Sequence, residues 1–219
     1  METTLIICFL QGTNIRTRHG ERAVETLRVG DPVWTLDDGC QPLRWCGRFE
    51  VGADRLRTDP SVHPVRVRAG ALGPAVPRRD LFVSQQHRLL VRSRIAGRMF
   101  DTPEVLVAAK KLIGAPGIEI VPRRGPMTYF HLVLDRHAIV EADGAQTETM
   151  LIAPQAVRGL SQADRDAVLA GRDLDDALAN PPSPARPIIR KRSLTDKLVA
   201  RAVANAKPLQ EPPGAVVAA

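Results

Sequence analysis

The chain has few aromatic residues, few cysteines and no long apolar run, and each shortage excludes a class of protein. Aromatic residues are 4% of the 219 positions, which is little for a surface that stacks the bases of single-stranded nucleic acid. The three cysteines, Cys8, Cys40 and Cys46, cannot all pair and exclude a disulfide-stapled mini-protein. The longest apolar run near the start, residues 5–10, is too short to cross a bilayer and follows no basic segment. We therefore expect a cytoplasmic protein without a signal peptide or transmembrane helix; secretion by a signal-independent route stays open.

Hydrophobic residues at 44% and charged residues at 25% are typical of a globular protein with a buried core. The formal charge of +7 is unevenly placed. Residues 186–207 carry seven basic side chains against the single acid Asp196, so most of the net charge belongs to this C-terminal part. The preceding chain is close to neutral, and no basic binding face is implied there.

Short apolar stretches separated by Gly, Pro, Asp and Asn fill the chain as far as about residue 152. Strands are predicted at 5–10, 14–17, 31–36, 42–48, 64–68, 80–84, 88–91, 104–107, 119–121, 128–134 and 138–141. Their close spacing indicates an all-β domain, because a βαβ sheet would need long helical patterns between strands, and only residues 107–113 resemble even a short helix. We assign residues 1–152 to this domain and residues 153–219 to a helical, partly disordered basic tail.

The tail carries different signals. Residues 161–164 form a capping box that opens a helix, and residues 180–187 form a Pro-rich spacer that cannot be helical. Residues 193–196 form a second capping box, which starts a short helix with Leu194, Leu198 and Ala202 on one face. The last residues, 208–219, are expected to be loose.

Cys8 lies in an apolar strand pattern, where a single cysteine is more often a packing residue than a nucleophile. Its neighbours change this interpretation. Residues 8–17, Gly20 and residues 24–35 together resemble the N-terminal block of Hint domains, the module shared by inteins and hedgehog autoprocessing domains.

Two further segments support the resemblance. Residues 81–91 look like the Thr-x-x-His block of the family, with Ser84 in place of Thr and with His87. Residues 129–144, which contain His131 and His137, resemble the block near the C-terminal end of the domain. Residues 65–73 and Asp80 are similar to the bacterial stand-alone Hint subgroup. The resemblance covers about residues 6–150 and implies a horseshoe of short twisted strands with pseudo-two-fold symmetry.

The resemblance implies self-processing chemistry at the Ile7–Cys8 bond. A thiolate is a strong nucleophile, and Cys8 can attack the carbonyl of its preceding residue to give a thioester, an N-to-S acyl shift. The resemblance places His87 where it can protonate the leaving nitrogen, Ser84 where it can polarise the bond, and His131 and His137 as assistants in the second step.

Each of these residues also has a structural interpretation. His87 alone could be a satisfied core histidine, and Ser84 could be a turn hydroxyl. His131 and His137 share parity along a strand, so both can face one side. The strand between them is apolar throughout, so one of the pair could be only packing.

The sequence departs from inteins at the end of the domain. Residues 143–150 contain no His-Asn pair, which inteins need to release their C-terminal flank, so we expect cleavage without splicing, as in hedgehog-type processing. His131 fills the strand position where inteins commonly carry Asp or Cys. Such a protein reacts once, on its own N-terminal flank, and is not a turnover enzyme.

Two other functions stay open. The chain could be a catalytically silent Hint-fold binding module for an unknown protein partner, in which replacing Cys8 changes nothing. The basic tail could contact anionic membrane, although a solvated linker is the simpler interpretation, and no nucleic-acid partner is expected. No cofactor is implied, and the spacing of the histidines and cysteines does not suggest a metal site.

Overall fold

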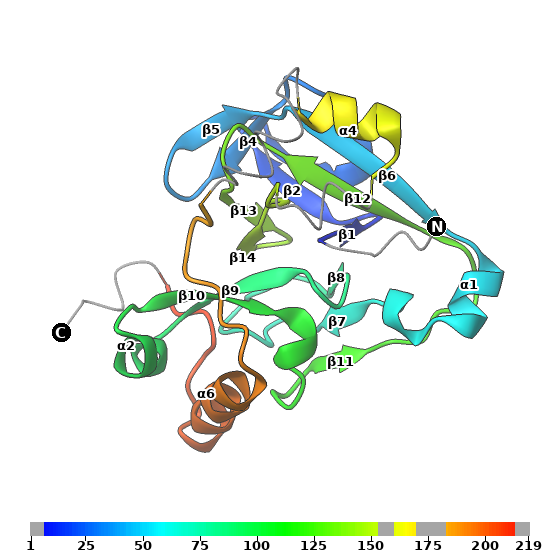
Figure 1. Cartoon of the computed structure of the whole chain (residues 1–219). Helices are drawn as coiled ribbons and strands as arrows, with labels where there is room; N and C mark the ends of the chain where they lie inside the picture. Colours follow the sequence, from blue (N-terminus) through cyan, green and yellow to red (C-terminus); the bar gives the residue numbers. More distant parts are fainter. Residues whose placement is uncertain (1–6, 153–159, 170–182, 213–219) are drawn as a thin grey trace.

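Antiparallel strands form two sheets in the computed structural model, which describes residues 7–152, 160–169 and 183–212 (Figure 1). The six-stranded sheet runs in the order β11 (Ile118–Ile120), β7 (Val65–Val67), β8 (Leu81–Val83), β1 (Phe9–Leu10), β12 (Met127–Val133) and β6 (Trp45–Val51). The second sheet runs in the order β10 (Glu104–Ala108), β9 (Arg88–Arg92), β14 (Ala145–Glu148), β13 (Ile139–Ala142), β2 (Asn14–Thr17), β4 (Pro32–Thr35) and β5 (Gly39–Pro42), with β3 (Gly20–Ala23) paired to β2.

Helices are short and lie around the sheets. They are α1 (Ala53–Thr58), α2 (Arg94–Phe100), α4 (Gln162–Leu169) and α6 (Arg192–Ala204), with single 3₁₀ turns η1 (Val24–Thr26), η2 (Pro60–Val62) and η3 (Ala109–Lys111). Among the described residues, no helix is long and apolar enough to cross a membrane.

The register of β1 positions the start of the domain between two strands. Phe9 pairs with Val83 of β8 on one side and with Phe130 of β12 on the other. Cys8, which precedes Phe9, therefore lies between the end of β8 and the middle of β12. The pairing of β12 with β6 places His131 opposite Gly47.

The all-β prediction is confirmed, although several elements differ from the predicted ones. The predicted strand 42–48 is two strands, because β5 ends at Pro42 and β6 begins at Trp45. The sequence patterns missed β3, β14, α1 and α2. All four residues of β14, Ala-Gln-Thr-Glu, are buried, and a polar stretch of this kind does not show the alternation that predicts a strand.

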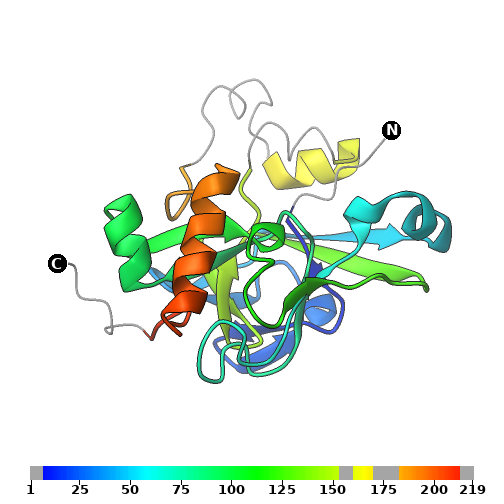
Figure 2. The same ribbon diagram turned by 90° about the horizontal axis from the view of Figure 1, so that it is seen from below.

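The described part of the tail packs on the β domain. Figure 2 shows α6 beside α2, and its buried face joins the main core through Leu198, Val199 and Ala202. Beyond α6, the Gln210 side chain donates to the carbonyls of Leu90 at 2.7 Å and Gln146 at 2.9 Å. The division at residue 152 stays a prediction, but residues 183–212 are no separate linker.

Two expectations for the tail need correction and one is confirmed. Ser161 caps the first helix as expected: the Asp164 amide donates to Ser161 Oγ at 3.1 Å, and the same hydroxyl donates to the Asp164 carboxylate at 2.6 Å. The second does not: α6 begins at Arg192, without a side-chain cap, and Asp196 pairs with Arg192 at 2.8 Å. The expected loose end is wrong for Leu209 and Gln210, which are buried; residues 213–219 lie outside the described residues.

Candidate functional site

Cys8 is fully buried. Both the amide and the carbonyl of Cys8 are hydrogen-bonded to Ser84. The Cys8 amide donates to Ser84 Oγ at 3.1 Å, and the Cys8 carbonyl accepts from the Ser84 amide at 3.0 Å. Ser84 follows β8 directly, so the pairing of β8 with β1 sets these contacts. The nitrogen of the Ile7–Cys8 bond thereby donates to a hydroxyl that is itself buried, while the role of Ser84 in a reaction stays a prediction.

His131 contacts both the thiol and the carbonyl of this bond. Its Nδ1 lies 2.7 Å from the Ile7 oxygen and its Nε2 lies 3.5 Å from Cys8 Sγ. A carbonyl oxygen can only accept, so Nδ1 carries the proton and Nε2 is left to accept from the thiol. Burial lowers the pKa of His131, while the Ile7 carbonyl and the charge of Asp164 oppose this shift. A neutral imidazole therefore bridges nucleophile and electrophile.

Trp45 covers His131. The two rings are stacked with their centroids 6.1 Å apart, and Val133 of β12 and Val168 of α4 pack against the indole. The indole lies across Gly47, where a Cβ would come 1.9 Å from Trp45 Cη2. The glycine therefore leaves the space that the indole needs over the β6–β12 pair.

His87 is fully buried between β8 and β9 and is neutral. Burial, with the charge of Arg88, lowers its pKa to about 3. Its Nε2 is bonded to Thr147 Oγ1, and that hydroxyl donates to the Arg88 carbonyl at 2.9 Å. Nε2 is therefore the donor. The imidazole packs edge-on against Phe9, with the ring centroids 4.5 Å apart, and the Cys8 backbone opposes the lowering of its pKa.

His137 lies in a different network. Because β12 ends at Val133, His137 is not on the strand of His131, and the expectation based on shared parity is wrong. Its Nε2 lies 3.0 Å from Glu148 Oε2, and its Nδ1 accepts from the Ala185 amide at 2.9 Å. With both ring nitrogens engaged, His137 connects β14 to the tail.

The other two cysteines lie elsewhere. Burial raises the pKa of Cys46 to about 11, which keeps it a thiol, and Cys40 is half-buried. Over residues 7–152, 160–169 and 183–212, no group of three or more His, Cys, Asp or Glu side chains is placed to hold a metal ion.

The sequence missed Thr147, Trp45 and Glu148. Thr147 fixes the proton of His87, Trp45 covers His131, and Glu148 accepts from His137 and from the amide of Arg88 at 2.9 Å. Thr147 and Glu148 lie on β14, where no pattern indicated a strand. Only Trp45 had a weak signal in the sequence. Gly47 follows it by two residues on the same strand, and a glycine inside a strand often marks a place where another group approaches closely.

We expect stability to fall as the pH drops from about 6.5 toward 3. The unfolded His87 has an ordinary pKa near 6.5 and the folded one near 3, so between these values only the unfolded chain takes the proton. At pH 5 this costs the fold about 2 kcal/mol relative to pH 7 and above. Urea unfolding at pH 7 and pH 5 measures the difference, and His87→Gln should lose less stability than the wild type; an equal loss contradicts the assignment.

Comparison with known protein families identifies the family of this chain. The model of the Hint domain family matches residues 7–154, and none of the curated proteins matches the chain. Similar solved structures include the AceL NrdHF class 3 split intein, with 13% identity and a TM-score of 0.42 over 65% of this chain and 96% of that one.

Two more similar structures are an intein-like domain from Clostridium thermocellum, with 15% identity and a TM-score of 0.41, and the gp41-1 intein, with 12% identity and a TM-score of 0.38. This chain is covered to 66% and 64%, and those chains to 99% and 96%. The family model spans well over half of the sequence, and the chain belongs to the Hint domain family.

Proposed function

We propose that the chain cleaves itself at the Ile7–Cys8 bond through a thioester, without splicing. The Hint fold supports self-processing chemistry in general. The observation that carries the specific proposal is the position of His131, whose two ring nitrogens contact the Cys8 thiol and the Ile7 carbonyl at once.

The first step forms a carbon–sulfur bond and breaks a carbon–nitrogen bond. Nε2 of His131 takes the thiol proton as Sγ of Cys8 attacks the Ile7 carbonyl carbon, and Nδ1–H stabilises the developing oxyanion. Collapse expels the Cys8 nitrogen as a free amine, which gains a proton. The thiol proton is thus transferred to nitrogen overall, and no co-reactant is consumed.

Ser84 and His87 would serve the leaving nitrogen. Ser84 Oγ already accepts from the Cys8 amide, so the hydroxyl stands beside the nitrogen and would hold it as the carbon–nitrogen bond breaks. The resting His87 has no proton on Nδ1, so it acts as the acid only after Nδ1 has received one. Because the pKa of His87 is low, the protonated imidazole is a strong acid and readily gives this proton to the leaving Cys8 nitrogen.

The second step opens the thioester. Water or an added thiol attacks the acyl carbon, the carbon–sulfur bond breaks, and the Cys8 thiol is restored. The absence of a His-Asn pair in residues 143–150 leaves no means to cleave the C-terminal side. Both ring nitrogens of His137 are engaged, which supports a structural rather than a catalytic role for it.

The test is the intact mass of the purified full chain with a folded protein fused ahead of Met1. Incubation with dithiothreitol or hydroxylamine should release the fusion partner and leave a chain that begins at Cys8. Persistence of the whole mass in a folded protein over days contradicts the proposal and favours the binding-module alternative.

A further inference from the structure

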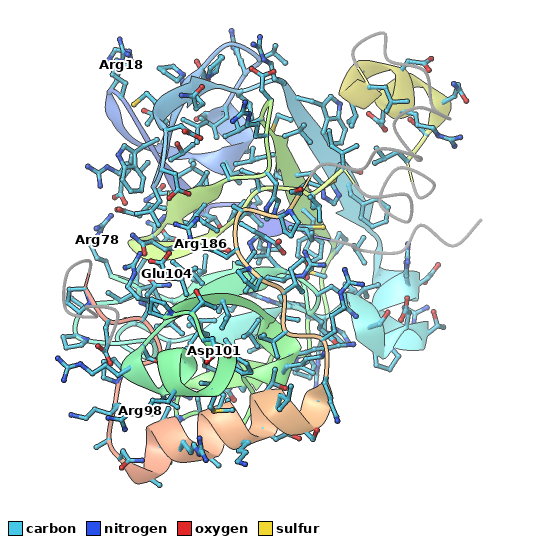
Figure 3. All side chains as sticks on the ribbon, turned by 60° about the vertical axis from the view of Figure 1, so that its left-hand side comes forward. Arg18, Arg78, Arg98, Asp101, Glu104 and Arg186 are labelled. Carbon is cyan, nitrogen blue, oxygen red and sulfur yellow. The ribbon has the colours of Figure 1, made fainter. Side chains whose placement is uncertain are left out.

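A groove of about 820 Å³ lies between α2, α6 and the segment after α6. Four cationic side chains line it, Arg94, Arg98, Arg201 and Lys207, against the single carboxylate of Glu211. They come from chain segments about a hundred residues apart, which the packing of α6 on α2 brings together. The labelled Arg98 can be followed at the junction of the two helices in Figure 3.

Three of these cations lack a neutralising partner. Within the described residues, Arg98, Arg201 and Lys207 form no ion pair, whereas Arg78, Arg186 and many other arginines of the structure pair with carboxylates. Like charges around one concavity repel each other, and the low-dielectric walls of a groove strengthen their joint field. An anion in the groove would relieve this repulsion.

The size and lining of the groove favour one kind of anion. Its volume is in the range of small-molecule sites, which extends from about 300 to 1,000 Å³. Arginine presents paired donors that match phosphate oxygens, and lysine adds a point charge. No aromatic side chain among the described residues lines the groove, so it offers no stacking platform for bases.

We propose that this groove binds a small ligand that carries two or more phosphate groups. Three or four cations exceed what a single phosphate needs and match two phosphates spaced along one molecule. The site shares no residue with the Cys8 centre and does not depend on self-cleavage. It also gives the basic C-terminal part of the chain a folded role in place of a solvated linker.

Isothermal titration of the full chain with inorganic tripolyphosphate tests the site directly. We expect saturable binding near one ligand per chain, weakened by added salt because the contacts are ionic. The variant Arg98→Glu/Arg201→Glu/Lys207→Glu should bind at least about tenfold more weakly, since each contact is a charge-assisted hydrogen bond.

A matched control separates the groove from the overall charge. Arg28→Glu/Arg124→Glu/Arg136→Glu changes three exposed arginines outside the groove, and each triple variant lowers the formal charge from +7 to +1. The control should retain the wild-type affinity. Equal weakening in both variants overturns the proposal, because binding then follows net charge alone.

Two further arms complete the test. If the glutamate variant unfolds by circular dichroism, the triple glutamine variant at the same groove positions replaces it and should also bind at least about tenfold more weakly. Vesicles of phosphatidylcholine with and without cardiolipin distinguish a lipid headgroup from a soluble ligand, because only a headgroup site binds the cardiolipin vesicles. Binding of either probe should require the groove cations. Absence of binding to both tripolyphosphate and cardiolipin vesicles overturns the proposal.

Discussion

Replacing Cys8 by alanine is expected to leave an N-terminal fusion intact under conditions that cleave the wild type. The reaction needs a nucleophile whose attack on the Ile7 carbonyl is intramolecular. The Cys8 thiol lies beside His131 at this bond, whereas Cys40 lies on β5 and Cys46 on β6. The expected effect is a complete loss of the chain that begins at Cys8, read by intact mass after thiol treatment. The exchange removes one buried sulfur, so the fold should survive and can be checked by circular dichroism.

The matched control is Cys40→Ala, which removes a different thiol and should cleave like the wild type. A thioester intermediate also predicts that hydroxylamine cleaves the wild-type fusion to a hydroxamate at Ile7 and leaves Cys8→Ala untouched. Cleavage that continues in Cys8→Ala at the same rate would show hydrolysis of the peptide bond without the thiol and would refute the mechanism.

His131→Gln is expected to slow cleavage by about a hundredfold or more. The exchange removes the base for the thiol, a role worth about 10²–10⁴ in rate, and weakens the donor to the Ile7 oxygen. The amide of glutamine has no titratable group, so the rate should also lose the pH dependence that His131 supplies. Rates measured by gel over a range of pH values give both readouts.

The exposed His19 provides the control, because His19→Gln changes the same residue type outside the site and should leave the rate unchanged. His131→Gln also removes a partner of Trp45, so its thermal unfolding must be measured alongside. A variant that stays folded and cleaves at the wild-type rate would exclude His131 from the reaction. His87 would then be the next base to test, by the same exchange to glutamine.

Much of the candidate site was visible in the sequence because it consists of short blocks. Cys8, Ser84 and His87 lie in local segments whose turns and strands fix their side chains, so the resemblance to Hint domains was enough to select them. The structure brings Ser84 and His131 into direct contact with Cys8 or the bond that precedes it. Their roles in the reaction remain to be tested.

The choice between His131 and His137 required long-range packing. Parity along the chain treated the two residues alike, but β12 ends between them, and His137 bonds to Glu148 and to Ala185 of the tail. No residue pattern near His137 in the sequence indicates either of these contacts. Glu148 lies on a strand whose polar residues are all buried, and Ala185 is 48 residues away from His137 in the chain.

The sequence by itself determined the all-β class and the strand-rich region as far as about residue 152, because these depend on local alternation and turn residues. The ordered motifs selected Cys8 and the histidines as candidates, whose roles stay predictions. Only the tertiary structure decided which histidine reaches Cys8, which protonation state burial imposes on His87, and where the basic tail lies. Those properties depend on register between distant strands and on desolvation, and a single strand or helix contains no information about either.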